Sequence, residues 1–183
     1  MESRLRERLD PIDAERLEAG RSYAAVCILL REVGDAPEVL FVKRAERSTD
    51  PWSGQIAFPG GRYKASDSDL VETALRELEE ETGIRRDVVR LVGALPFINP
   101  SNSPNLLVKP YVALLSGEAQ PRRGSEVQKL MWVPLIDLKI LATDVYSKYS
   151  ASVRKHLCYL YGDDLIWGMT SKLVRRVLQL LGL

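Results

Sequence analysis

Gly60–Ile84, GGRYKASDSDLVETALRELEEETGI, is the stretch that decides the fold. It begins with two glycines, continues through a polar loop and ends in a segment rich in glutamate. At about 100° per residue, a helix places three of these acids on one face, Glu77, Glu80 and Glu81, and leaves Glu79 on the other side. An apolar stripe lies beside the acidic face and consists of Val71, Ala74, Leu75 and Leu78. We therefore expect one helix with a core-facing side and three converging acids next to it.

Three acids at helical spacings of three and four residues repel one another unless a cation lies between them. Carboxylate oxygens are the ligands that hard divalent ions such as Mg²⁺ and Mn²⁺ prefer. Arg76 lies one turn before Glu80 and can steady it by an ion pair. The alternative is a solvated, glutamate-rich helix face, which is the ordinary interpretation of a run such as RELEEE. The sequence thus leaves a metal site and a plain surface as rivals at this point.

Both ends of the expected helix carry recognisable signals. Asp69, with Glu72 three residues later, is typical of a capping pair at a helix start. Gly83 is typical of a helix end. The pair Gly60-Gly61 has no Cβ atoms, so the backbone there can turn tightly and approach a ligand closely.

The same stretch resembles the Nudix box, GX5EX7REUXEEXGU with U apolar. The residues that fill the pattern are Gly61, Arg76, Glu77, Leu78, Glu80, Glu81, Gly83 and Ile84. Two departures stand out: the early acid is Asp67 instead of Glu, and one extra residue separates it from Arg76. The same lengthening occurs in the coenzyme A pyrophosphatase branch of the Nudix family.

The segment ahead of the box, LFVKRAERSTDPWSGQIAFPGGR, is similar to the signature of that branch, LLTxRS, a later Arg and then GxxxFPGG. The matching residues are Leu40, Arg44, Gly54, Phe58, Pro59, Gly60 and Gly61. The later Arg has no clear equivalent, since Arg47 or Thr49 falls near it with a changed spacing. Ile166–Thr170, IWGMT, followed by a helix, also resembles the C-terminal end of the branch.

The resemblance implies an α/β fold, the Nudix α/β/α sandwich with a mixed β-sheet, over residues 21–183. It implies hydrolysis of a diphosphate linkage, with Mg²⁺ or Mn²⁺ held by Glu77, Glu80, Glu81 and a carbonyl at Gly61. Arg76 completes the box, and Glu126 matches an acid that lies ahead of a W-V-P-L strand in the family. Glu80 or Glu126 is the expected general base.

The expected substrate is coenzyme A or an acyl derivative, cleaved to 3′,5′-ADP and 4′-phosphopantetheine. The candidate substrate-binding residues are Arg44, Arg47 and Arg62. The alternatives among enzymes are ADP-ribose or another nucleoside diphosphate derivative, a (deoxy)nucleoside triphosphate and an isoprenoid diphosphate. The alternative of another class is a non-catalytic nucleotide-binding module that keeps the scaffold.

The composition of the 183 residues is 45% hydrophobic and 28% charged, which is typical of one soluble domain. A net charge of +1 provides no global field for nucleic acid. Cys27 and Cys158 lie in apolar surroundings far apart in sequence, which favours buried thiols and a cytoplasmic protein. No apolar run approaches the ~20 residues of a membrane span, so we expect no membrane partner.

Outside the box, period and turn residues predict the remaining elements. A charged amphipathic helix is expected over residues 3–19, interrupted near Pro11, as an N-terminal extension (residues 1–20) and a candidate surface for a homodimer. A long polar loop over Pro96–Pro110 is expected to form a wall of the site. The lone His156 has no partner pattern around it and is assigned a structural or surface role. The expected strands are 23–30, 39–42, 55–58, 88–95, 111–115 and 130–135, and the last helix is expected over 171–181.

Overall fold

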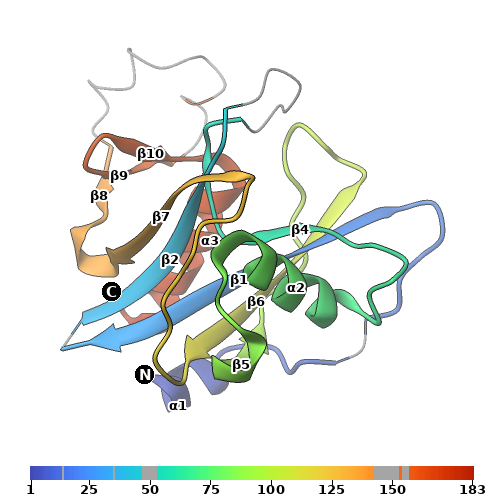
Figure 1. The fold of residues 1–183 in the computed structure, drawn as a ribbon, viewed down its shortest axis with the longest axis horizontal. Helices are drawn as coiled ribbons and strands as arrows, with labels where there is room; N and C mark the ends of the chain where they lie inside the picture. Colours follow the sequence, from blue (N-terminus) through green and yellow to red (C-terminus); the bar gives the residue numbers. More distant parts are fainter. Residues whose placement is uncertain (14, 35, 47–52, 142–152, 154–156) are drawn as a thin grey trace.

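The computed structural model describes residues 1–183 except 14, 35, 47–52, 142–152 and 154–156 (Figure 1). His156 and Arg47 lie outside the described residues, as does most of the segment before Leu157. The described helices are α1 (Glu2–Arg6), α2 (Leu70–Thr82) and α3 (Gly168–Leu181), with short 3₁₀ turns η1 (Arg86–Val88) and η2 (Leu135–Asp137).

A mixed sheet forms the centre of the molecule. Its strands are β1 (Ser22–Val33), β2 (Ala36–Arg44), β3 (Ile56–Ala57), β4 (Gly60–Arg62), β5 (Val89–Ala94), β6 (Leu106–Leu115) and β7 (Val127–Pro134). They run in the order β3-β2-β1-β6-β5, with β4 also paired to β1 and β7 to β2. The β1–β6 pair is parallel and the others are antiparallel. A second small sheet has β8 (Lys139–Ile140), β9 (Tyr159–Tyr161) and β10 (Asp164–Ile166).

Residues 23–30 of β1 form a continuous apolar run because both faces of the strand are covered there. Successive side chains of a strand point to opposite faces, so Ala25, Cys27 and Leu29 pack with α2, whereas Val26, Ile28 and Leu30 pack with α1 and α3. Two separate hydrophobic clusters result, one on each face of the sheet. The predicted α/β/α sandwich with a mixed sheet is confirmed: among the described helices, α2 covers one face of the sheet and α1 and α3 cover the other (Figure 1).

The predicted helix over residues 3–19 is wrong, because the described helix there ends at Arg6. The described residues between Pro11 and Arg21 are not helical, which agrees with the missing N–H of proline. Asp10 instead forms a β-bridge with Ala94 of β5, and Leu5 is completely buried in the same core as α3. The Arg4 guanidinium also donates to the carbonyl of Leu181 at 2.6 Å, which fastens the N-terminus to the end of α3.

The predicted loop over Pro96–Pro110 is also too long, because β6 begins at Leu106 and passes through Pro110. Proline is tolerated there because the pairing with β5 starts one residue later, at Tyr111, so no ladder bond to β5 needs the missing N–H. The last helix begins at Gly168, three residues earlier than predicted. The β1–β2 hairpin and the burial of Cys27 and Cys158 are confirmed.

Candidate functional site

The Gly60-Gly61 pair forms the short strand β4, which is wedged between β1 and the box helix. A Cβ atom at Gly60 would lie 2.4 Å from the carbonyl oxygen of Ala25 in β1. At Gly61 it would lie 2.4 Å from the carboxyl carbon of Glu77. At Gly60 only glycine fits, because the added atom would meet backbone, and at Gly61 a Cβ would displace the Glu77 carboxylate. The pair thus brings the strand's backbone directly against the acidic face of α2.

The box helix begins and ends as its sequence predicts. Asp69 is the N-cap and accepts a hydrogen bond from the backbone N–H of Glu72 at 2.7 Å. Glu72 itself does not complete the capping pair, since its carboxylate binds the guanidinium of Arg86 at 2.8 and 3.0 Å. Gly83 ends the helix in the left-handed conformation, with φ 67°. These caps fix the register that brings the acids to one side.

Glu77, Glu80 and Glu81 line one cleft, as the helical spacing predicts. Their side chains differ in exposure: Glu81 retains 8% of its accessible surface, Glu77 14% and Glu80 52%. Glu79 lies on the other side of the helix, 3.7 Å from Arg86. The acidic face therefore runs from a buried carboxylate to one that is open to solvent.

Burial is the main reason that the pKa of Glu81 rises from its ordinary 4.5 to about 7. The backbone N–H of Gly60, which donates to Oε2 of Glu81 at 3.0 Å, and Arg44 oppose that rise. The negative charges of Glu77 and Glu126 add to it. A buried acid with two acidic neighbours is a place where added positive charge would be strongly favourable.

Arg76 is held from both sides by acids. Its guanidinium forms two hydrogen bonds with Asp67, at 2.8 and 3.0 Å, and its Nη1 atom lies 2.6 Å from Glu77 and 3.1 Å from Glu80. Asp67 is buried and also accepts from Thr73 and from the backbone N–H of Lys64. The Arg76 guanidinium holds the pKa of Asp67 well below its usual range. Arg76 thus steadies Glu80, and Asp67 fixes Arg76.

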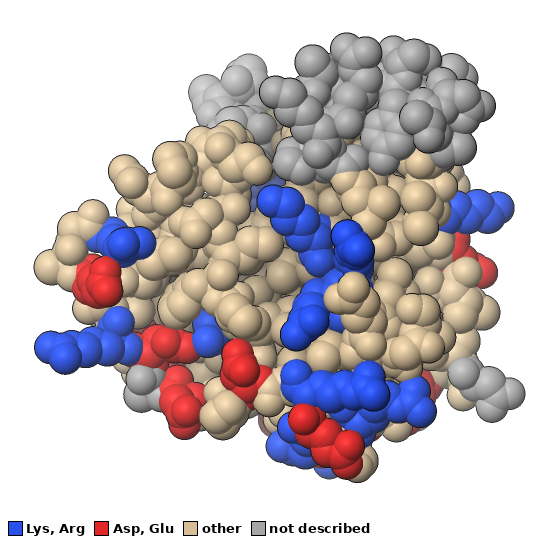
Figure 2. All heavy atoms as spheres, turned by 180° about the vertical axis from the view of Figure 1, so that it is seen from behind, with Lys and Arg blue, Asp and Glu red and all other residues tan. Residues whose placement is uncertain are grey.

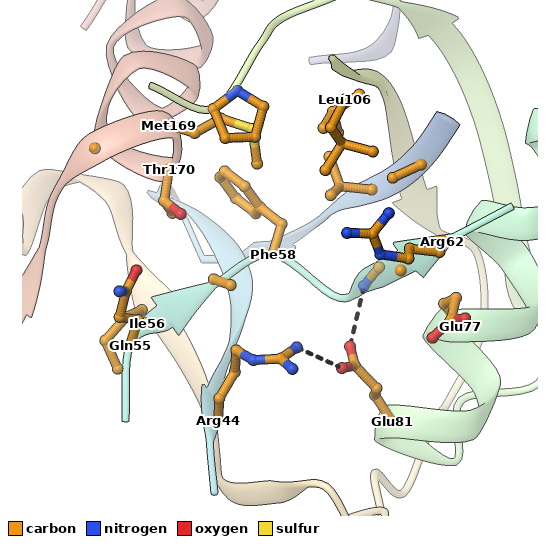
Figure 3. Close-up of a pocket in the computed structure, with 18 of the residues that line it drawn as sticks. Arg44, Gln55, Ile56, Phe58, Arg62, Glu77, Glu81, Leu106, Met169 and Thr170 are labelled. Atoms are coloured by element: carbon orange, nitrogen blue, oxygen red, sulfur yellow. Dashed lines mark hydrogen bonds and ion pairs between the residues drawn. The ribbon is translucent and has the colours of Figure 1, made fainter. Parts of the chain in front are cut away.

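The cleft has a volume of about 900 Å³ and contains further charged groups from three other segments. Arg44, at the end of β2, lies 4.0 Å from Glu81, and Arg62 follows the glycine pair (Figure 3). Glu126, just before β7, lines the same cleft. Of the predicted site residues that the structure describes, all lie at this cleft or, as Arg76 does, bind its acids.

Lys64 is a site residue that sequence reasoning missed. Its Nζ atom lies 3.9 Å from Glu77 and 3.7 Å from Glu80. Its position in the loop between the glycine pair and the box helix could have identified it from the sequence. The apolar part of the cleft comes from segments far apart in the chain. Phe58, Trp167 and Met169 were not predicted as site residues. Leu106 and Val108 belong to Pro96–Pro110, which was expected to form a wall of the site and does line the cleft.

The donor set is suited to a hard divalent cation. Three carboxylates of α2 share the cleft with Glu126, and the glycine pair leaves room for a backbone carbonyl beside them. As the side chains stand, no three acidic, histidine or cysteine groups within the described part of the chain converge on one point. Arg76 and Lys64 instead lie between Glu77 and Glu80 and neutralise them. The residues therefore fit such an ion once these two acids turn from their cationic partners.

The model of the NUDIX domain family matches residues 20–154. The chain belongs to the Nudix family. It is an enzyme, a hydrolase of phosphoric anhydrides, and members of the family generally use divalent metal ions. Within the described residues, no helix is long and apolar enough to cross a membrane.

Two relatives match over most of this Nudix chain. The Nudix hydrolase NudL of Photorhabdus laumondii is 33% identical over 92% of this chain and 90% of its own. The human mitochondrial coenzyme A diphosphatase NUDT8 is 31% identical over 91% of this chain and 72% of its own. The Nudix hydrolase RenU of M. smegmatis has the same fold, with a TM-score of 0.58 at 16% identity over 95% of this chain and 93% of its own.

Proposed function

We propose that this Nudix hydrolase cleaves the diphosphate linkage of coenzyme A or an acyl derivative, giving 3′,5′-ADP and 4′-phosphopantetheine, acylated or not. The observation that carries the proposal is the large cleft that joins the acidic face of α2 to an apolar region (Figure 3). A substrate with a diphosphate between a nucleotide and a long, weakly polar arm matches that shape. The 31% identity with a coenzyme A diphosphatase supports the same substrate class.

The proposed cofactor is Mg²⁺ or Mn²⁺, held by Glu77, Glu80 and Glu81 with a backbone carbonyl at Gly61. When bound, the ion neutralises the crowded charge of the anhydride and makes a water easier to deprotonate. The raised pKa of Glu81 supports this assignment, because a buried acid among acids gains most from a cation. The structural glycine at position 61 supports it too, since any side chain would displace Glu77.

The residues around the acids have three proposed roles: positioning the acids, contacting the substrate and accepting a proton. Asp67 and Arg76 keep the acidic face in position, because Arg76 bridges Glu77 and Glu80. Arg44, which lies beside Glu81, is placed to contact a phosphoryl oxygen, and Arg62 provides a second cation at the cleft. Either Glu80 or Glu126 takes the proton from the attacking water. Both line the cleft and both are exposed enough to exchange that proton with solvent.

The test is a substrate panel with the purified chain in Mg²⁺ and in Mn²⁺. It contains coenzyme A, octanoyl-coenzyme A, ADP-ribose, a deoxynucleoside triphosphate and an isoprenoid diphosphate, with products separated by chromatography. We expect 3′,5′-ADP from the first two at a kcat/KM at least tenfold above that of the others. Faster cleavage of ADP-ribose or a triphosphate would overturn the substrate assignment. Calorimetric binding of coenzyme A without turnover in either ion would favour the non-catalytic module.

Three further assignments rest on the sequence alone. Residues 1–20 are proposed as an extension and 21–183 as the catalytic domain, although Leu5 of the extension is buried in the catalytic core. A cytoplasmic location and a homodimer stay predictions. Sedimentation of the purified chain measures the second of these directly.

A further inference from the structure

The cleft has two chemically different halves. One half contains the acids and the cations, as Arg44, Glu81, Arg62 and Glu77 illustrate in Figure 3. In the same view Phe58, Leu106 and Met169 lie on the side away from the Arg44–Glu81 pair. The apolar half is built by Phe58 after β3, by Leu106 and Val108 of β6, and by Trp167 and Met169 at the start of α3. A ligand that fills both halves must have a charged part and an apolar part.

The cations decide which part of a substrate enters which half. Among the described residues that line the cleft, the cations are Arg44, Arg62 and Lys64. Arg44 lies 4.0 Å from Glu81 and Lys64 lies 3.7 Å from Glu80, so both belong to the acidic half. A phosphate moved among apolar side chains without a cation loses its hydration with no compensation. The phosphorylated nucleotide therefore stays in the charged half, and the other arm of the substrate extends over the apolar half.

We infer that the apolar half binds an acyl chain at the far end of that arm, and that Met169 and Leu106 determine which chains are accepted. This inference rests on the proposed function and refines it from coenzyme A to acyl-coenzyme A. Leu106 is buried and fixed by the β6 ladder, whereas Met169 is partly exposed on the first turn of α3. Methionine has a flexible side chain that adapts to apolar ligands of varying shape. Met169 is thus the position at which the size of this half is easiest to change.

The expected preference follows from burial of methylene groups. Each methylene removed from water increases affinity roughly fourfold when it is fully buried. An eight-carbon chain that is only partly covered should still raise kcat/KM by at least about tenfold over the free thiol. The gain should appear mainly in KM, because the acyl chain lies away from the acids and contributes the same binding before and during reaction.

The experiment compares free, acetyl-, octanoyl- and palmitoyl-coenzyme A as substrates of the wild type and of Met169→Trp, Met169→Leu and Met169→Ala. The wild type should prefer octanoyl- to free coenzyme A by at least about tenfold. Met169→Trp fills the apolar half, and the ratio of the two kcat/KM values should fall by about tenfold or more. Met169→Leu conserves volume and should keep the wild-type ratio. Met169→Ala enlarges the site and should move the preference toward the longer chain.

Calorimetry in the absence of divalent ions provides a readout that does not depend on turnover. Octanoyl-coenzyme A should bind more tightly than coenzyme A to the wild type, and Met169→Trp should remove the difference. Thermal melts of all three variants show whether they fold. Cleavage of coenzyme A with no preference for octanoyl-coenzyme A, or an unchanged ratio in Met169→Trp, would overturn the inference and leave the proposed function standing. If neither thioester nor free thiol is cleaved while another diphosphate is, the proposed function fails and the inference falls with it.

Discussion

The two long helices cover opposite faces of one sheet, yet they bury different kinds of side chain. α3 buries only apolar or hydroxyl-bearing residues, and its charged residues, Lys172, Arg175 and Arg176, are all exposed. Figure 2 shows Lys and Arg side chains gathered over the middle of that side of the molecule. α2 has the same amphipathic pattern but buries Glu81 as well, and it packs beside the buried Asp67. Buried charge is costly unless it is paired, so its presence on α2 and its absence from α3 agree with a catalytic site on the α2 side, as proposed.

The largest expected effect comes from neutralising the acids of α2. Glu81→Gln and Glu80→Gln should each lower kcat by at least about 10²-fold, because stabilisation by a bound divalent ion is worth several kcal/mol. Both variants should keep the wild-type fold, and Glu81→Gln still offers an oxygen to the N–H of Gly60. Steady-state kinetics in Mn²⁺ and a thermal melt measure the two quantities.

Glu79→Gln is the matched control for these variants, since it removes the same charge from the opposite side of the same helix. Its activity should remain within about twofold of the wild type. If Glu80→Gln and Glu81→Gln both retain full activity, the assignment of metal ligands to this face is wrong.

Substitutions at the two adjacent glycines should have different effects, on activity at Gly61 and on stability at Gly60. An added Cβ at Gly61 meets the carboxylate of Glu77, which is the end of a flexible side chain and can move aside. Gly61→Ala should therefore fold normally but lose about 10²-fold in activity through a misplaced acid. At Gly60 the added atom meets the backbone of β1, which cannot move cheaply, so Gly60→Ala should cost at least about 2 kcal/mol of stability. Denaturant unfolding and kinetics of both variants test the contrast, and equal destabilisation of both would refute it.

The Asp67–Arg76 pair should be worth far more than an exposed pair on the same helix. Asp67→Asn leaves the Arg76 guanidinium, whose side chain is only 15% exposed, without its main partner, so we expect a loss of about 3 kcal/mol in stability and about tenfold in activity. Glu72→Gln breaks the ion pair between Glu72, which is 31% exposed, and Arg86, which is 46% exposed. This should cost less than about 1 kcal/mol of stability. Chemical denaturation of both variants measures the difference. A similar cost for the two would show that burial does not decide the value of these pairs.

The sequence predicted some parts of the site and not others. The box helix, its caps at Asp69 and Gly83 and its acidic face follow from local spacing, which a helix converts directly into geometry. The Asp67–Arg76 bond was not foreseen, because Asp67 precedes the helix and helical spacing does not give the direction of its side chain. Most of the apolar half of the cleft was not foreseen for a similar reason, although Leu106 and Val108 lie within Pro96–Pro110, which was expected to form a wall of the site. Phe58, Leu106 and Met169 come from three distant segments, and only the folded sheet brings them together.

The errors in the predicted elements have the same origin. The spacing of Leu5 and Leu9 fits a long helix, but tertiary pairing of Asp10 with Ala94 takes the chain out of helical conformation. Pro110 suggested a loop, although its position just outside the β5 pairing makes it harmless in β6. Local patterns therefore predicted the secondary structure that each segment prefers by itself, and pairing within the sheet overrode that preference at these two positions.

The buried acid of α2 should also give the metal-free protein a pH-dependent stability. Burial raises the pKa of Glu81 to about 7 in the folded state, whereas the unfolded chain exposes it with the ordinary value of 4.5. Between these values the folded state binds more protons, so stability falls as pH rises, by on the order of 3 kcal/mol across the window. The pKa of Asp67 is lowered instead, so that group does not titrate here.

The measurement is the free energy of unfolding from pH 4.5 to 8 in the presence of a chelator, for the wild type and Glu81→Gln. The difference between the two curves should grow by that amount as pH rises. Mn²⁺ should raise the Tm of the wild type more at pH 8 than at pH 5.5, since ligands must be ionised to bind it. Parallel curves for the two proteins would mean that Glu81 is ionised throughout the range.

The smallest effects should come from the outer face of α3. Lys172→Gln and Arg175→Gln remove exposed charges, and we expect stability to change by less than about 0.5 kcal/mol and activity to stay within about twofold. Thermal melts measure the stability, and kcat/KM at low and at physiological salt measures the activity. A clear loss of kcat/KM at low salt that disappears at high salt would mean that this basic face attracts the anionic substrate over a distance. The two sides of the sheet would then both serve catalysis, one by contact and the other through its field.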